Sequence, residues 1–142
     1  MTGVIKVNEL QGRTTADDIT VTVGSTTMQL QSGLAKAMAQ YFGATNVLQS
    51  GSLNHSSVTD NGTGDFTHNF TNNFGSTVYN VVGSSDRQAV TITSLIFYEP
   101  KDNSARATGS MAMECIYTNE PSPNRSMFDL EVNDFIAYGD LA

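Results

Sequence analysis

Few side chains in this sequence could do acid–base or nucleophilic chemistry. The chain has two histidines, His55 and His68, and a single cysteine, Cys115. His68 alternates with Phe66 and Phe70 on one predicted strand, so we expect it to be structural or exposed, and no serine-nucleophile elbow or reactive-cysteine context accompanies it. His55 lies in a polar stretch and is expected at the surface, and nothing in the spacing of the two histidines favours a shared metal. We expect Cys115 to be a small buried hydrophobe.

Two groups of neighbouring carboxylates are also predicted to be non-catalytic. Residues 60–65, DNGTGD, offer the oxygen ligands that calcium prefers, but they lack the bidentate glutamate of an EF-hand loop. Because Asp-Asn-Gly is a strong signal for a tight turn, we expect a hairpin there and no metal. The pair Asp17 and Asp18 is expected to be solvated. The sequence therefore predicts no catalytic residue, no metal and no cofactor, and a protein that is not an enzyme.

Charge and composition argue against two classes of partner. The net charge is −7, and the seven basic residues are scattered singly through the 142-residue chain. Nucleic-acid binding needs basic side chains gathered on one face, so we expect neither nucleic acid nor an anionic membrane as partner. The N-terminus has no long apolar run, and one cysteine allows no intrachain disulfide. These features predict folding in the cytosol.

Composition and periodicity predict a mainly β fold. Apolar residues (39 %) and charged residues (15 %) are both below their usual shares, and neutral polar residues and glycine replace them. Turn signals recur about every 8–12 residues, which fits a single antiparallel β-sandwich or a small barrel. Residues 1–28 are expected to form an N-terminal β arm and residues 29–142 the β domain. Strands are predicted at residues 4–10, 19–23, 46–53, 66–70, 78–82, 90–98, 110–118 and 128–138.

One short helix is predicted over residues 33–42. Leu30, Leu34, Met38 and Tyr41 follow one another at spacings that form a single apolar stripe on a helix. A helix of this length is marginal by itself. We therefore expect Leu34, Met38 and Tyr41 to pack it against the sheet or against a neighbouring subunit.

The last predicted strand alternates apolar and polar residues. Asp134 interrupts its apolar face, which is either a bulge or a carboxylate at an interface. The apolar face is expected to consist of Phe128, Leu130, Val132, Ile136 and Tyr138.

Several stretches resemble structural proteins of tailed bacteriophages, especially marine and cyanobacterial ones. In those proteins a GLAKAW-like helix leads into SVTDNGTGDFT-NFT and then into a strand that ends in YxVVG. The matching stretches here are residues 33–37, 57–67, 69–71 and 79–83. Residues 132–140 are similar to the closing strand of those modules, and the opening GVIKVNELQGRTT resembles the start of many phage fibre-like proteins. Met38 stands where the family usually has tryptophan, and residues 84–127 match nothing in the family.

The resemblance implies a place on the virion rather than a ligand. Such modules lie at fibre tips or particle surfaces, often as trimers. We therefore expect a non-enzymatic homotrimeric surface fibre or receptor-binding subunit, made in the host cytoplasm. It would contact other virion proteins and a host surface glycan or receptor. The alternative is a head decoration or tail-accessory subunit, which the short chain favours; a lectin or glycosidase is disfavoured because the chain has no tryptophan.

Loops are where a rigid scaffold usually carries its binding residues. The predicted loops at residues 83–88, 101–110 and 119–126 contain four of the seven basic residues. On an acidic protein, these cations are candidates for contact with an acidic glycan or an acidic partner. They are Arg87, Lys101, Arg106 and Arg125.

Overall fold

The computed structural model describes most of the chain and groups it into two compact units, Met1–Leu34 and Ala35–Ala142. The boundary predicted from the sequence lay between residues 28 and 29. Within the described part of the chain, no helix is long and apolar enough to cross a membrane. The described residues are 19–23, 25–30, 33–43, 45, 47–86, 95–102, 106–118 and 125–142.

The first unit contains an antiparallel β-hairpin. Strand β1 (Thr20–Val23) pairs with β2 (Thr26–Gln29), and the amide of Leu30 donates to the carbonyl of Ile19 beyond the last pair (2.7 Å). The strand predicted at residues 19–23 is thereby confirmed, with β1 beginning one residue later. The strand predicted at residues 4–10 lies outside the described residues.

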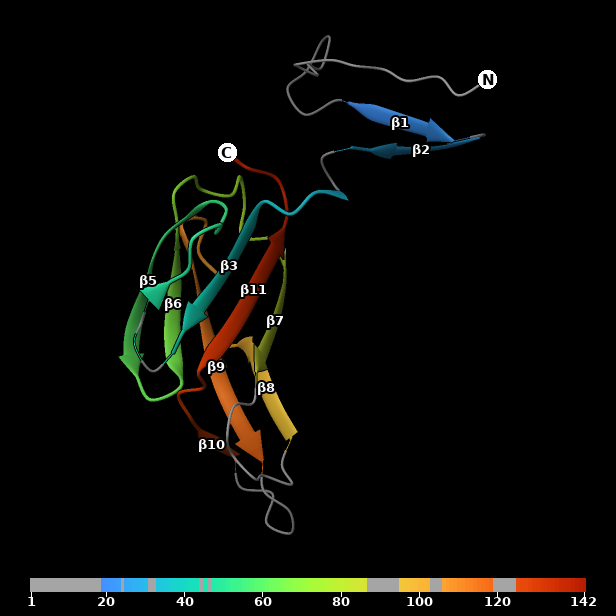
Figure 1. Ribbon diagram of the computed structural model, residues 1–142. Helices are drawn as coiled ribbons and strands as arrows, with labels where there is room; N and C mark the ends of the chain where they lie inside the picture. Colours follow the sequence, from blue (N-terminus) through green and yellow to red (C-terminus); the bar gives the residue numbers. More distant parts are fainter. Residues whose placement is uncertain are drawn as a thin grey trace. The chain divides into compact units, whose positions relative to one another are not determined.

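The second unit consists of two antiparallel sheets packed as a sandwich, which is one of the two predicted architectures; it is not a closed barrel (Figure 1). The four-stranded sheet has the order β4 (Val47–Leu48), β3 (Ala37–Phe42), β11 (Val132–Tyr138) and β7 (Asn80–Asp86). The five-stranded sheet contains β5 (His55–Gly62), β6 (Asp65–Phe70), β9 (Ser110–Thr118), β8 (Leu95–Pro100) and β10 (Arg125–Met127). In Figure 1, β11 runs between β3 and β7.

The core between the sheets is rich in aromatic residues. Alternate residues of β6 are buried, which confirms the two-residue period predicted for this strand. In β9, Met111, Met113 and Cys115 belong to the core, and Glu114 and Ile116 are buried as well. Burying one large apolar side chain contributes about 1.5–3 kcal/mol. The largest buried side chains include Tyr41, Phe66, His68, Phe74, Met111, Met113 and Phe135.

The helix predicted over residues 33–42 is wrong, because residues 37–42 form strand β3. Its burial alternates, with Ala37, Ala39 and Tyr41 buried and with Met38 and Gln40 exposed. The helix was predicted from the spacing of the large apolar residues, and the alternating small residues Ala37 and Ala39 gave no comparable signal for a strand. Alanine favours a helix locally, but its propensity is a weak prior that pairing with β11 and burial override.

The face predicted for the last strand is inverted. The buried residues of β11 are Asn133, Phe135 and Ala137, and Asp134 and Ile136 lie on the outer face. A shift of one residue exchanges the buried and exposed faces of a strand. In β11 the large ring of Phe135 packs in the core, so Phe135 and the residues two positions before and after it face inward. Asp134 pairs in register with both neighbouring strands, so it is not a bulge.

Candidate functional site

The outer face of the four-stranded sheet carries apolar side chains in a row that crosses it. Met38 of β3 lies opposite Leu53 on one side and opposite Ile136 of β11 on the other, and Ile136 lies opposite Val82 of β7. Relative exposures are 42 % for Met38, 46 % for Leu53 and 60 % for Val82. We call these four residues the apolar row. Contiguous exposed apolar surface of this kind usually marks an interaction site.

A carboxylate stands beside the apolar row. Asp134 lies on the same face as Ile136, two positions earlier in β11, and opposite Gln40 and Ser84. Gln40 donates from Nε2 to Oδ1 of Asp134 (3.0 Å), and the Ser84 hydroxyl donates to Oδ2 (3.4 Å). Both donors are neutral, and no ion pair to Asp134 occurs among the described residues. The carboxylate is therefore held in position by two neutral donors, without a neutralising cation among the described residues.

A surface cavity of about 420 Å³ lies where the apolar row meets Asp134. Met38, Ile136 and Asp134 line it from the sheet, and residues 50–52 line it from the turn that follows β4. Ser52 anchors this turn by donating to the carbonyl of Gln49 (2.9 Å). The cavity can therefore contact an aliphatic group and a hydrogen-bond donor at the same time.

The two histidines are in contact, with His68 in the core and His55 half-buried beside it, which the sequence did not predict. His68 is fully buried between the sheets, and its Nδ1 lies 3.0 Å from Nε2 of His55. The Nε2 atom of His68 lies 2.6 Å from the Tyr98 hydroxyl, which in turn lies 3.3 Å from the Tyr41 hydroxyl. The surface position expected for His55 is wrong, and the structural alternative for His68 is the one observed.

A backbone carbonyl at one end of this series of hydrogen-bonded side chains determines which of their atoms carry protons. The carbonyl of Leu53, 3.2 Å from Nδ1 of His55, can only accept, so a neutral His55 donates there and accepts at Nε2. His68 then donates from Nδ1 and accepts at Nε2 from Tyr98. The Tyr98 hydroxyl is also within hydrogen-bond distance of the Tyr41 hydroxyl (3.3 Å). Neighbouring hydrogen bonds in such a network polarise one another.

Burial keeps these four hydrogen-bonded side chains uncharged. Loss of hydration holds the pKa of His68 well below its usual 6.5, and the neighbouring His55 lowers it further. Burial also lowers the pKa of His55, while backbone hydrogen bonds partly oppose the effect. The pKa values of Tyr41 and Tyr98 are raised mainly by burial. The four side chains therefore form a neutral, hydrogen-bonded part of the core near pH 7.

A β-bulge explains why the sequence-based prediction placed His55 at the surface. The β5–β6 pairing shifts register between His55 and Ser57, so that His55 lies opposite Phe70. In the register of the neighbouring pair Ser57 and Asn69, position 56 would have occupied this inward place. The predicted strand before the hairpin ended at residue 53, so His55 was not expected on a strand, and the bulge that turns it inward left no signal in the sequence.

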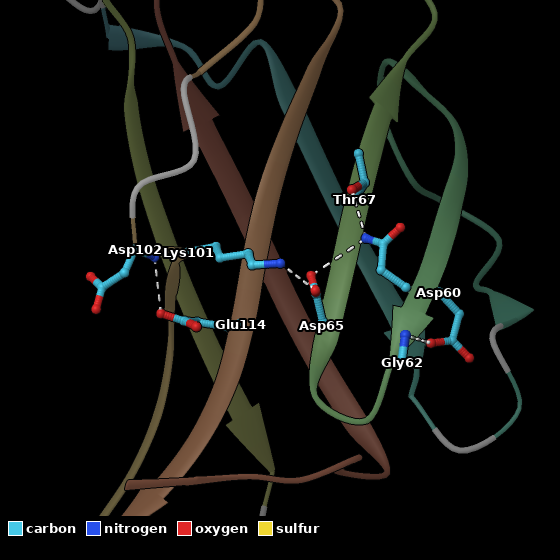
Figure 2. Close-up of polar contacts among 8 residues, drawn as sticks. Asp60, Gly62, Asp65, Thr67, Lys101, Asp102 and Glu114 are labelled. Atoms are coloured by element: carbon cyan, nitrogen blue, oxygen red, sulfur yellow. Dashed lines mark hydrogen bonds and ion pairs between the residues drawn. The ribbon is translucent and has the colours of Figure 1, made fainter.

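The DNGTGD segment forms the predicted hairpin between β5 and β6. Gly62 lies opposite Asp65, and the Gly62 amide donates to the Asp60 carboxylate (2.8 Å). Figure 2 shows the Lys101 ammonium pointing at the Asp65 carboxylate, with which it forms an ion pair. Nearby, the Asp102 amide donates to Glu114 (3.1 Å). The charge on Asp65 is therefore balanced by a side chain of the same protein.

Gly64 ends this turn in a position that only glycine fits. Its φ of +69° lies in the left-handed region, and a Cβ atom would lie 2.7 Å from both the Cys115 carbonyl oxygen and the Phe128 amide nitrogen. The Cys115 amide donates to the Gly64 carbonyl (2.8 Å), and the Phe128 amide donates to the Cys115 carbonyl (3.2 Å). At Cys115 the strand beside β9 changes from β6 to β10. The glycine thus allows two strands to share one edge of β9.

Cys115 is a buried thiol, as predicted. Its relative exposure is 0 %, and burial raises its pKa to about 11. A protonated, inaccessible thiol is a poor nucleophile and a poor metal ligand. Within the described residues, no group of three or more histidine, cysteine or acidic side chains is arranged to hold a metal ion.

The four loop cations are not brought together by the described structure. Lys101 is paired with Asp65, and the guanidinium of exposed Arg106 lies 6.0 Å from the centre of the Tyr79 ring. Arg87 lies outside the described residues, and the side chain of Arg125, the first residue of β10, is likewise not described. Their role in binding stays a prediction.

The packing trio predicted from the helix is dispersed. Tyr41 is fully buried in the sandwich core, whereas Met38 is on the opposite face of the same strand. Leu34 is the last residue of the first unit and is 52 % exposed. Of the three, Met38 lies on the surface that we consider the candidate functional site.

The candidate site thus consists of the apolar row, the positioned carboxylate of Asp134 and the cavity between them. The comparisons with known proteins add no family: no family model matches the chain, and neither a curated protein nor a solved structure does.

Proposed function

We propose that this protein is a non-enzymatic structural subunit of a bacteriophage particle that self-associates, as a trimer, through the outer face of its four-stranded sheet. The observation that carries the proposal is the apolar row, in which three of the four side chains are at least 42 % exposed. Covering such surface is a major favourable term in protein association. The resemblance of residues 57–67 to phage structural proteins supplies the place on a virion.

The β-sandwich is well suited to this role. Its strands are committed to packing, so its faces and loops remain available for contact without changing the core. A surface fibre or receptor-binding subunit uses such faces for assembly and such loops for a host glycan or receptor. A head decoration or tail-accessory subunit, which would use the same faces to bind the particle rather than a host, is the second candidate.

Self-association is tested by sedimentation equilibrium at micromolar concentration. The wild-type protein should give about three times the chain mass of 15.2 kDa. Met38→Asp places a charge in the apolar row and should yield a folded monomer, because an unpaired carboxylate in an interface is costly. Val78→Asp is the matched control, since Val78 is 86 % exposed and outside the row. A monomeric wild-type protein contradicts the proposal.

The place on the particle is tested by electron microscopy of virions labelled with an antibody against this chain. Labelling at fibre or tail tips supports the fibre subunit, and labelling over the head or tail body supports the decoration or accessory subunit. Purified particles that never carry the label, although infected cells contain the protein, contradict both candidates.

A further inference from the structure

The carboxylate of Asp134 limits how the outer face of the four-stranded sheet can be covered. Its two hydrogen-bond donors, Gln40 and Ser84, are neutral, and the described residues offer it no cation. A carboxylate that loses water without gaining a compensating charge is strongly unfavourable. A partner that covers the apolar row and the adjacent cavity must therefore bring a positive charge to Asp134.

This requirement argues against stacking two such faces about a two-fold axis. An isologous contact uses the same patch on both copies, so it would bring two Asp134 carboxylates toward each other. Like charges opposed in an interface disfavour that arrangement. A heterologous contact joins two different surfaces, can offer a cation to Asp134, and closes into a ring when the rotation permits.

We propose that Asp134 and the apolar row receive an arginine side chain from a second copy of this chain, in a head-to-tail ring. The inference rests on the proposed self-association. An arginine can lay its aliphatic stem over Met38 and Ile136 while its guanidinium reaches both carboxylate oxygens of Asp134. The cavity of about 420 Å³ at this place provides the concave site for it.

Charge complementarity points to Arg106 as the donor. The chain has a net charge of −7, so a second copy has few cations to offer. Lys101 is occupied by Asp65, whereas Arg106 is exposed and forms no ion pair within the described residues. Its guanidinium carbon lies 6.0 Å from the centre of the Tyr79 ring, and a cation–π contact uses none of the five N–H donors that a carboxylate could accept from.

The test compares the trimer dissociation constants of variants by analytical ultracentrifugation. Asp134→Asn should weaken self-association by at least about 30-fold, the usual minimum for losing one partner of a desolvated charge pair. Asp140→Asn is the matched control, because Asp140 is exposed, lies outside the cavity and carries the same charge. Asp134→Arg and Arg106→Asp should each weaken association, and the double variant should restore it to within about tenfold of wild type.

The outcomes separate this inference from the proposed function. A wild-type monomer overturns both. A trimer that Met38→Asp dissociates but Asp134→Asn leaves unchanged supports the proposed face and overturns the inference. Loss of association in both single charge variants without recovery in the double variant overturns the pairing of Arg106 with Asp134. A single cooperative unfolding transition in each monomeric variant confirms that it has folded.

Discussion

Lowering the pH should destabilise the folded protein through His68. This ring is fully buried and neutral, and its pKa in the folded state is held well below 6.5 by burial. In the unfolded chain the same ring has its ordinary pKa of about 6.5. Between these two pKa values the unfolded state binds more protons, so stability is fully present above pH 6.5 and decreases as the pH falls below it.

The size of the effect follows from proton linkage. Each pH unit in this window removes about 1.4 kcal/mol per proton taken up on unfolding. Going from pH 7.5 to pH 5.0 should therefore reduce the free energy of unfolding by about 2 kcal/mol through His68 alone. His55 acts in the same direction with a smaller contribution, because it is only half-buried. Protonation of either His55 or His68 is further disfavoured by the hydrogen bond between the two rings, because that bond needs one unprotonated nitrogen as its acceptor.

Urea unfolding at pH 7.5, 6.5, 5.75 and 5.0 measures this slope. The window stops at pH 5.0 because carboxylates titrate below it. His68→Phe is the informative variant, since Phe66 and Phe70 already place the same ring on this face of β6. It should be less stable at pH 7.5, because Tyr98 and His55 lose a partner, yet its stability should change with pH by about 2 kcal/mol less than that of the wild type. Equal pH slopes in the two proteins would refute the assignment of His68 as a buried neutral ring.

Three further predictions test other parts of the structure. Gly64→Ala should cost at least about 1–3 kcal/mol of stability in urea unfolding, because it strains a left-handed residue against two backbone atoms; Gly51→Ala, also at positive φ but with open space around it, should cost less. EDTA and calcium should leave the melting temperature unchanged, because the DNGTGD hairpin is stabilised by hydrogen bonds and by the Lys101 ion pair; a melting temperature that EDTA lowers and calcium restores contradicts this. Cys115 should react with a thiol reagent at pH 8 only as fast as the protein unfolds, because the thiol is buried and its pKa is about 11; rapid labelling of the native protein contradicts its burial.

Local patterns in the sequence were sufficient for much of the β architecture. The strand predicted at residues 110–118 has the same extent as β9, and the expected burial of Cys115 is observed. The Asp-Asn-Gly signal predicted the β5–β6 hairpin, which depends mainly on residues close together in the chain. These features were predictable because a strand period and a tight turn are local properties.

The features that define the candidate site depended on contacts between distant residues. Alanine residues 37 and 39 suit a helix or a close-packed strand equally, and only pairing with β11 selected the strand. That strand placed Met38 beside Ile136 and Asp134, on a face whose inward or outward sense was set by packing of Phe135 in the core. For β11 the sequence by itself therefore determined the two-residue period, and the tertiary structure decided the phase, because a period-two pattern can be buried on either side. For β3 the tertiary structure also decided that the segment is a strand.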